Sequence, residues 1–298
     1  MVLGGTLFFL AKALKDHWQE VAAIRIDAVG WASLVIALGI TLLAHVWSGW
    51  VWTWMLHELN QPVTDAQFVQ IYLKTNIAKY LPGNVWHYYG RITAAKNAGV
   101  PASAATLSVL LEPLLMAAAA LVLVLIGIQP TASNSRVTLQ GLPLIGLALV
   151  LIAVHPRFLN AAIYFLGKLK LKTTHPNTVD DSFQIVRYPL KPLLGELGFI
   201  GLRGTGFLLT LLAFRHLELR QIPLLLGTFS FAWLLGLVVP GAPGGLGVFE
   251  ATVIALLQHH FSGGLIISAI ALYRIVSILA EATGAGLAWL DEHRCSSS

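Results

Sequence analysis

Two stretches decide the fold of this chain: NIAKYLPGNVWHYYGR at residues 76–91 and VVPGAPGGLGVFEAT at residues 238–252. In each, a Pro-Gly pair interrupts a hydrophobic segment and a charged residue follows. Arg91 comes nine residues after Pro82, and Glu250 comes ten residues after Pro240. Proline removes a backbone donor and clashes with the preceding turn, and glycine accepts the φ angles of a sharp reversal. Each stretch therefore predicts a broken helix.

The composition places these breaks in a membrane protein. Of the 298 residues, 56% are hydrophobic and 11% charged, and the mean hydropathy is +0.74. Soluble domains have about 25% charged residues. At roughly 20 apolar residues per span, the length accommodates about seven or eight hydrophobic segments. We predict an all-α, polytopic membrane bundle with residues 1–294 as a single domain and residues 295–298 as a disordered tail.

Hydrophobic periodicity gives the predicted segments. They cover residues 2–14, 31–56, 64–79, 102–128, 142–166, 193–214, 222–239 and 265–290. The first of these, at 2–14, is short for a membrane span. The segment at 64–79 is amphipathic and is expected to lie in the interface or to line a wet cavity. Its Lys74 and Lys79 are expected to extend to the lipid headgroups. The connection at 167–191 is the most basic and is placed on the cytoplasmic side of the cell membrane.

Several function classes are excluded by what the chain contains. The formal charge of +5 is explained by basic loops facing the cytoplasm, so no nucleic-acid partner is expected. A single cysteine, Cys295, excludes an internal disulfide and a cysteine metal site. GGLG lacks the Lys-Ser/Thr of a phosphate-binding loop. His259 and His260 have no acidic or cysteine ligand at suitable spacing, so neither a metal nor a cofactor is predicted. His87 is interpreted as interfacial packing.

Two interrupted segments, one in each half, are the pattern of transporter folds built from internal repeats. The identity between them is too short to establish a repeat by itself, and whether each unit crosses the membrane or turns back stays open. Irregular backbone survives in a bilayer only where protein or a water-filled cavity surrounds it. Gly244, Gly245 and Gly247 lead into the helix that carries Glu250, and a helix N-terminus with exposed amides is an anion site. In a membrane the expected anion is a lipid phosphate.

Charged residues inside apolar segments support a polar interior. Each costs about 2.5–3.5 kcal/mol at the centre of a membrane helix, so it is expected to face a cavity or a counter-charge. We predict an interior with the cations Arg91, Arg203 and Arg274 and the acids Glu112, Glu250 and Glu281. Residues seven apart, such as Glu196 and Arg203 or Arg274 and Glu281, share a face but lie about 10 Å apart along the axis. They are expected to pair with neighbouring helices, and Glu196 and Arg203 are interpreted as a structural clamp.

At these residues the chain resembles a known family. YLPGNVWHYYGR, LLEPLL, VPGAPGGLGVFEA and ALYRIVSILAEATGAG are similar to the lysylphosphatidylglycerol synthase transmembrane-region family. This is the flippase-like membrane domain of the multiple peptide resistance factor. The resemblance implies a helical domain with re-entrant segments that moves lipids between leaflets. The site residues it implies are Pro82, Gly83, Arg91, Glu112, Pro240, Gly241, Gly244, Gly245, Gly247, Glu250 and Arg274.

The chain also departs from the family. Pro113 stands where an arginine commonly follows the glutamate equivalent to Glu112, so the function of that pair is in question. The 298 residues contain no counterpart of the soluble aminoacyl-transferring domain. The resemblance therefore implies that this chain does not make lysyl-phosphatidylglycerol.

Three functions remain open at this level. The leading hypothesis is a lipid flippase that binds an anionic phospholipid or lipid-linked headgroup at the converging half-helices and Arg91. No ATPase-like motif is found, so transport would be down a gradient, ion-coupled or driven by a partner. A membrane-embedded transferase or hydrolase would need a base with a shifted pKa, for which Glu250, Glu112 and His87 are candidates. The third reading is a non-catalytic partner of a lipid-modifying enzyme, and a homo-oligomer is also left open.

Overall fold

The computed structural model describes residues 25–81, 83, 85–127, 136–161, 187–239 and 242–296, and in these ranges every regular element is helical. Pro82, Pro240 and Gly241 lie outside the described residues. So do the predicted segment at 2–14, most of the basic connection at 167–191 and the end of the predicted tail. The elements are α3 (Ala28–Glu58), α4 (Asp65–Asn76), η1 (Ile77–Tyr80), α5 (Trp86–Asn97), α6 (Ala102–Gly127), α7 (Arg136–Ala153), α9 (Leu190–Leu212), η2 (Leu219–Gln221), α10 (Ile222–Val238), η3 (Pro243–Gly245), α11 (Val248–Leu257) and α12 (Gly263–Ser296).

Four of the described helices are long and apolar enough to cross a membrane: Ala28–Glu58, Ala102–Gly127, Leu219–Val238 and Gly263–His293. The protein is therefore an integral membrane protein with an all-helical architecture. Two shorter apolar helices, Gly141–Ala153 and Val248–Leu257, accompany them. The predicted total of seven or eight segments and their re-entrant character remain predictions.

The predicted segment at 142–166 is shorter in the structure than the hydropathy suggested. α7 ends at Ala153, a turn follows, and a new helix begins at Pro156. The residue before a proline is disfavoured in the α conformation, and proline itself fits the first helical position. The sequence His155-Pro156 therefore ends one helix and starts the next, which the apolar pattern alone did not reveal.

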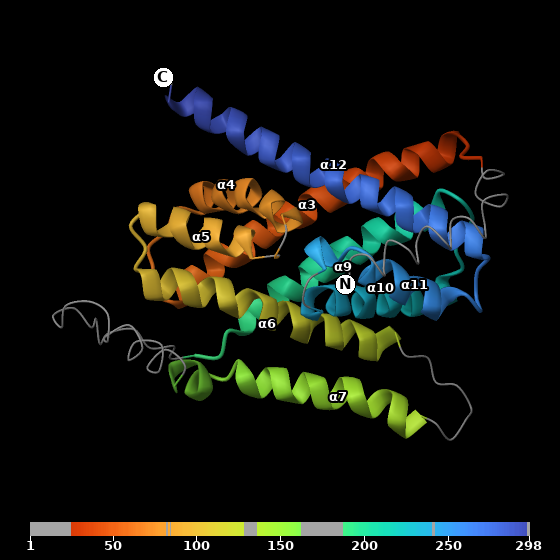
Figure 1. The fold of residues 1–298 in the computed structure, drawn as a ribbon, viewed down its shortest axis with the longest axis horizontal. Coiled ribbons are helices and arrows are strands. Elements are labelled where there is room, and N and C mark those ends of the chain that lie inside the picture. The colour runs from red at the N-terminus through yellow and green to blue at the C-terminus, as the bar shows by residue number, and fades with distance from the viewer. Residues whose placement is uncertain are drawn as a thin grey trace.

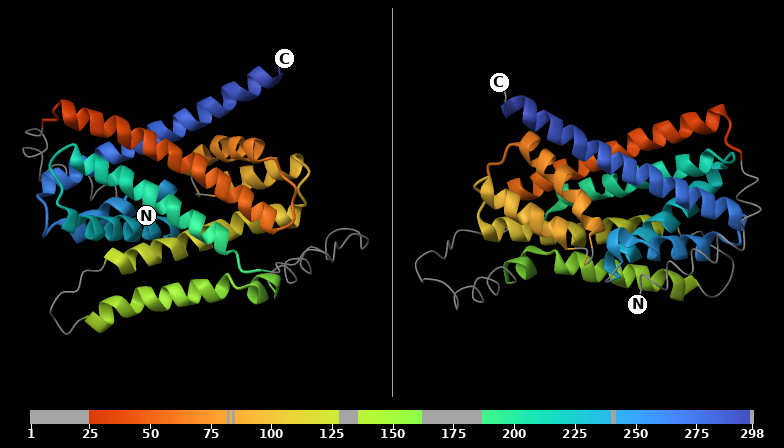
Figure 2. Two further views of the ribbon diagram at one scale, coloured as in Figure 1. Left: turned by 180° about the vertical axis from the view of Figure 1, so that it is seen from behind. Right: turned by 45° about the horizontal axis from the view of Figure 1, so that its top comes forward.

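α6, α7 and α10 lie along nearly the same direction, whereas α3 and α12 cross each other at a slant to them (Figures 1 and 2). α4 and α5 lie side by side at one end of the bundle, and α10 and α11 lie side by side at the other end (Figure 1). α6 starts at the end where α5 finishes, and α12 starts at the opposite end, so the two run in opposite directions (Figure 1). The two halves of the chain thus approach the middle of the bundle from its two ends.

Close backbone contact joins α6 to α10, and aromatic packing holds the second half together. A Cβ on Gly127 of α6 would lie 2.5 Å from the Cα of Gly227 of α10, so only glycines allow this crossing. Phe207, Phe229 and Tyr273 come from α9, α10 and α12, and their ring centroids lie 5.5–5.7 Å apart. Phe249 of α11 joins them at 5.6 Å from Phe229. This aromatic cluster fixes the short helix α11 against three long helices.

Candidate functional site

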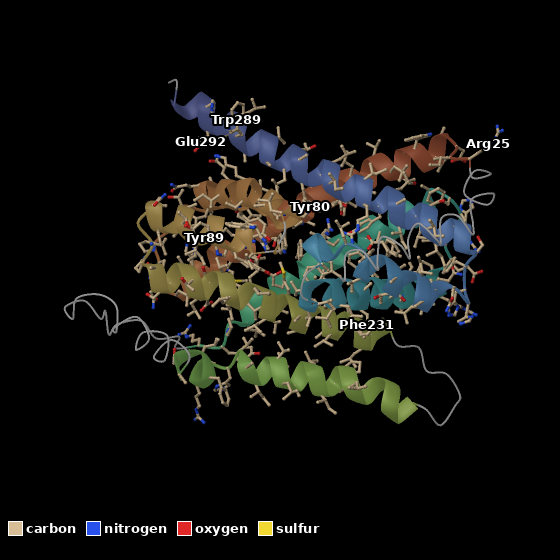
Figure 3. All side chains as sticks on the ribbon, in the orientation of Figure 1. Arg25, Tyr80, Tyr89, Phe231, Trp289 and Glu292 are labelled. Carbon is tan, nitrogen blue, oxygen red and sulfur yellow. The ribbon has the colours of Figure 1, made fainter. Side chains whose placement is uncertain are left out.

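The two interrupted motifs meet in the middle of the bundle. η1 ends at Tyr80, just before the first Pro-Gly pair, and it contacts η3, which follows the second pair. Gly244 has φ +58, and a Cβ there would lie 2.9 Å from Cε1 of Tyr80. Figure 3 places Tyr80 near the centre of the molecule, between the pair α4 and α5 and the pair α10 and α11. Glycine at 244 therefore permits both the backbone conformation and the contact with Tyr80.

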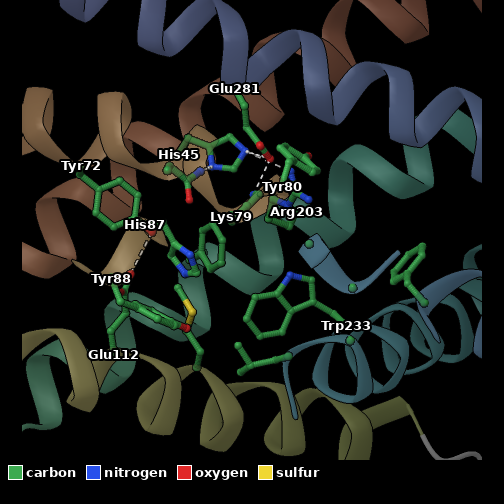
Figure 4. Close-up of a pocket in the computed structure, with 18 of the residues that line it drawn as sticks. His45, Tyr72, Lys79, Tyr80, His87, Tyr88, Glu112, Arg203, Trp233 and Glu281 are labelled. Atoms are coloured by element: carbon green, nitrogen blue, oxygen red, sulfur yellow. Dashed lines mark hydrogen bonds and ion pairs between the residues drawn. The ribbon is translucent and has the colours of Figure 1, made fainter. Parts of the chain in front are cut away.

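A polar cavity of about 110 Å³ lies at this meeting point (Figure 4). A buried water needs roughly 10–15 Å³ of such volume, so several waters fit. The described residues that line the cavity are His45, Tyr72, Asn76, Lys79, Tyr80, His87, Tyr88, Arg91, Glu112, Met116, Phe199, Arg203, Trp233, Gly236, Leu237, Gly244, Gly245, Phe249, Tyr273, Arg274 and Glu281. Charged groups from five different elements thus converge on one buried space.

Arg91 of α5 is already paired in this cavity. Both Arg91 and Glu112 are only 2% exposed, and Nη1 of Arg91 donates to Oε2 of Glu112 on α6. The hydroxyl of Tyr72 donates to the other oxygen, Oε1, at 2.9 Å, and the guanidinium carbon lies 4.2 Å from the centre of the Tyr72 ring. The partner of Glu112 thus comes from α5, whereas Pro113 occupies the next position within α6. Arg91 is less available to a phosphate than the sequence suggested.

The second motif contains a matching ion pair with the charges exchanged. Nε of Arg274 on α12 donates to Oε1 of Glu250 on α11. Its Nη1 and Nη2 donate to the carbonyls of Gly244 and Gly245 at 3.1 and 3.2 Å. The amide of Gly247 donates to Oε2 of Glu250. The N-terminus of α11 is therefore capped by its own glutamate, and the Gly247 amide does not face the cavity as an open anion donor.

A third group surrounds Glu281 of α12. Lys79 of η1 donates to Oε1 of Glu281 at 2.7 Å, and the Lys79 side chain is 19% exposed. Nε2 of His45 on α3 lies 3.2 Å from the same oxygen and 3.2 Å from Nη1 of Arg203 on α9. Figure 4 shows these four side chains converging on one wall of the cavity. The prediction that Lys79 extends to the headgroups is wrong, because a buried carboxylate attracts it inward.

Arg203 is the cation of this cavity that has no carboxylate of its own. It is 5% exposed, and within the described residues its Nη1 contacts His45 while its Nε has no hydrogen-bond partner. Glu196, seven residues earlier on α9, is fully buried and neither of its oxygens has a partner there. The predicted clamp by Glu196 and Arg203 is wrong, because Glu196 makes no ion pair and Arg203 faces the cavity.

The other predicted residues are distributed unevenly. Gly83 has φ +101 and is exposed, so it serves the turn and does not line the cavity. Gly244, Gly245 and Arg274 line the cavity, whereas Glu250 lies behind Arg274. His87 is 6% exposed and lines the cavity, which differs from the expected interfacial packing. No cluster of metal-ligating side chains occurs within the parts of the chain that the structure describes.

Sequence reasoning missed two groups of lining residues. His45 is the polar exception in the middle of an apolar span, and such a residue is a functional-site signal in itself. Tyr72, Asn76 and Lys79 line the cavity from the amphipathic segment, for which the sequence allowed either an interfacial or a cavity position. Which face of that segment points inward depends on α12, and no local pattern reveals it.

The model of the family described as lysylphosphatidylglycerol synthase TM region matches residues 1–282 of the chain. The match covers all the cavity residues named above, from His45 to Glu281. A comparison with curated proteins gives no match.

Proposed function

The chain belongs to the lysylphosphatidylglycerol synthase TM region family, whose model covers residues 1–282 of its 298, and from this premise we propose that it is a flippase-type lipid transporter. Its cargo is a phospholipid or lipid-linked molecule with an anionic headgroup. The headgroup enters the central cavity, and the acyl chains stay in the bilayer. The family and the apolar helices support a membrane protein linked to lipid handling. The charge and size of the cavity support the particular cargo.

The observation that carries the proposal is Arg203. Arg91, Lys79 and Arg274 each have a carboxylate partner, namely Glu112, Glu281 and Glu250 in turn. Within the described part of the chain, Arg203 has the His45 ring as its hydrogen-bond partner and lies over the Tyr273 ring, and its Nε is buried without a partner. With the histidines and Glu196 neutral, the cavity has one excess positive charge. A guanidinium binds phosphate or carboxylate oxygens in two parallel hydrogen bonds, so this charge fits an anionic headgroup.

The size of the cavity limits what enters it. Pockets for complete drug-sized ligands enclose about 300–1,000 Å³, whereas this cavity encloses about 110 Å³. A charged headgroup fits such a volume after displacing water, and a diacyl chain does not. The tails must therefore remain outside, between helices that face the lipid. Large apolar side chains such as Leu110, Ile275 and Ile278 are exposed on α6 and α12, as a lipid contact requires.

The arrangement of the two halves supports movement between leaflets. Each half provides two helices that meet at a break, α4 and α5 in the first and α10 and α11 in the second, followed by a long helix that carries the partner charge. Arg91 on α5 pairs with Glu112 on α6, and Glu250 on α11 pairs with Arg274 on α12. The two units enter from opposite ends of the bundle (Figure 1). Inverted units around a central site are the architecture from which alternating access develops.

Reconstitution into liposomes tests the proposal. Fluorescent or spin-labelled phosphatidylglycerol, phosphatidylserine and phosphatidylcholine would be compared for leaflet exchange. We expect exchange of the anionic lipids above the protein-free rate. Arg203→Ala should reduce the exchange rate about 10- to 100-fold, because a hydrogen bond to a charged group contributes about 1.5–3 kcal/mol. Arg203→Lys should retain part of the rate.

Arg157→Ala is the matched control, because Arg157 is an exposed arginine at the start of the helix after α7. It should leave exchange unchanged. Equal rates for wild type and Arg203→Ala would overturn the assignment of Arg203. Equal rates for protein-containing and empty liposomes would overturn transport itself. Chromatography of the recovered lipids covers the alternative function, because a transferase or hydrolase would yield a new lipid species.

A further inference from the structure

We propose that Glu196 is a proton-binding site that couples headgroup transport to proton movement. This inference rests on the proposed function and adds an energy source to it. In the conformation described above Glu196 carries its proton, and the headgroup and the proton travel in the same direction.

The burial of Glu196 without a partner is the reason to infer that its side chain is protonated. The residue lies in the second turn of α9, is 0% exposed, and neither carboxyl oxygen has a hydrogen-bond partner in the described part of the chain. The carboxylates of Glu112 and Glu281, which line the cavity, and of Glu250, which lies behind Arg274, each have at least one charged partner. An ionised carboxylate without a partner is expensive to bury, and the group responds by taking up a proton. Glu196 is the carboxyl group here that meets this condition.

The charged groups near Glu196 come from the first half of the chain. Glu112 on α6 and Arg91 on α5 are close enough to interact with it, and Tyr72 on α4 lies in the same group. Glu112 is the only ionisable side chain on α6, and α10 has none. On α3 the nearest candidate is His45, whose ring packs 6.3 Å from that of Phe199, one turn after Glu196.

The remaining ionisable groups that α12 directs at α9 are on the other side of the cavity. There Tyr273 lies against Arg203, and Glu281 is held by Lys79 and His45. Arg91 is thus the cation that serves both Glu112 and Glu196.

Two carboxyl groups that share one guanidinium provide a switch. While Glu196 is protonated, Arg91 forms an ion pair with Glu112 alone, and the structure contains this Arg91–Glu112 pair. When the O–H bond of Glu196 breaks, the electron pair stays on the carboxylate, the proton passes to water, and Arg91 faces two negative groups. The cavity then loses its one excess positive charge. An anionic headgroup held by Arg203 is retained while Glu196 is protonated and released when the proton leaves.

Infrared spectroscopy of the purified protein in nanodiscs at pH 7 tests the proton directly, without any transport. The carbonyl stretch of a protonated carboxylic acid is separate from the bands of a carboxylate. Glu196→Gln should remove an acid band relative to wild type. Glu218→Gln is the matched control, since Glu218 is exposed before η2, and it should remove carboxylate intensity only. Loss of carboxylate intensity in Glu196→Gln would overturn the proposal.

Glu112→Gln tests the sharing of Arg91. Without the charge of Glu112, Arg91 is left for Glu196, which should ionise, so the acid band should disappear although Glu196 is intact. A band that persists in Glu112→Gln would refute the switch. Glu196→Met is included because a neutral buried group should tolerate an apolar residue of similar volume. Failure of both Glu196 variants to fold would show that a partner holds an ionised Glu196, which also contradicts the proposal.

Liposomes with a pH gradient test the coupling. In wild type, exchange of the anionic lipid should accelerate at least several-fold when the gradient drives protons in the direction of transport, and a protonophore should abolish the gain. Glu196→Gln should exchange lipid at one rate whatever the gradient. A gradient response that survives in Glu196→Gln refutes the coupling. If no variant exchanges lipid, the proposed function fails, and the infrared result still decides whether Glu196 binds the proton.

Discussion

Replacement of Arg91 by methionine should destabilise the protein far more than replacement of the whole ion pair. Both Arg91 and Glu112 are 2% exposed, so Arg91→Met leaves a buried carboxylate with only the Tyr72 hydroxyl as a partner. Removal of one member of a buried pair costs about 3–5 kcal/mol, and loss of the stacking on Tyr72 adds about 1 kcal/mol. We therefore expect Arg91→Met to lower the free energy of unfolding by about 4–6 kcal/mol.

The double variant Arg91→Met/Glu112→Met removes both charges at once. An apolar pair of similar volume is often neutral or stabilising in place of a buried ion pair, so we expect it to lie within about 1–2 kcal/mol of wild type. Tyr72 loses its acceptor but keeps its contact with the hydroxyl of Ser48 at 2.7 Å. Glu112→Met alone should cost less than Arg91→Met, because Arg91 still interacts electrostatically with the carboxyl group of Glu196.

The assay is equilibrium unfolding in mixed micelles by titration with a denaturing detergent. Tryptophan fluorescence includes the signal of Trp52, whose ring lies 5.7 Å from the Arg91 guanidinium, and circular dichroism reports the loss of helix. The double-mutant cycle should give a coupling energy of about 3 kcal/mol or more, the upper end for residues in contact. Additive losses in the two single variants and the double variant would refute the conclusion that this pair is a closed, buried unit.

Two further predictions concern the other walls of the cavity. Gly244→Ala should lower the free energy of unfolding by about 1–2 kcal/mol, because alanine is strained at φ +58 and its Cβ meets Tyr80. Gly286→Ala, in open space on α12, should raise it by up to about 1 kcal/mol. Thermal unfolding measures both, and a tolerated alanine at 244 would contradict the tight junction. Lys79→Ala should lower the free energy of unfolding several times more than Lys74→Ala, because Lys79 pairs with a buried carboxylate and Lys74 with one that is 59% exposed. An exposed pair contributes only about 0–1 kcal/mol. Equal losses in the same assay would place Lys79 at the surface.

The sequence by itself was sufficient for the fold class. Composition identified a helical membrane protein, and the predicted segments at 31–56, 102–128 and 222–239 agree closely with α3, α6 and α10. These are properties of single segments, because twenty apolar residues must be helical in a bilayer whatever surrounds them. The family followed from the motifs and is confirmed by the match over residues 1–282. The Pro-Gly pairs also predicted where the helices break, although both prolines lie outside the described residues.

The pairing of the charges was decided only in three dimensions. Arg91 and Arg203 look alike in the sequence, as single arginines among apolar residues, and sequence reasoning chose Arg91 for the headgroup. The structure gives Arg91 a carboxylate from α6 and gives Arg203 only a histidine from α3. The same holds for Lys79, which turns inward because Glu281 of α12 lies beside it.

The physical reason for this division is that helix formation depends on interactions between sequence neighbours, whereas charge pairing depends on contacts between distant parts of the chain. Helix formation and membrane insertion depend on the polarity and backbone freedom of neighbouring residues, which the order of residues states directly. The environment of a buried charge depends on which helix faces it, and the partners here are 21, 24 and 202 positions apart in the chain. Only the packed bundle shows that three cations are neutralised, that Arg203 is not, and that Glu196 is buried without a partner among the described residues.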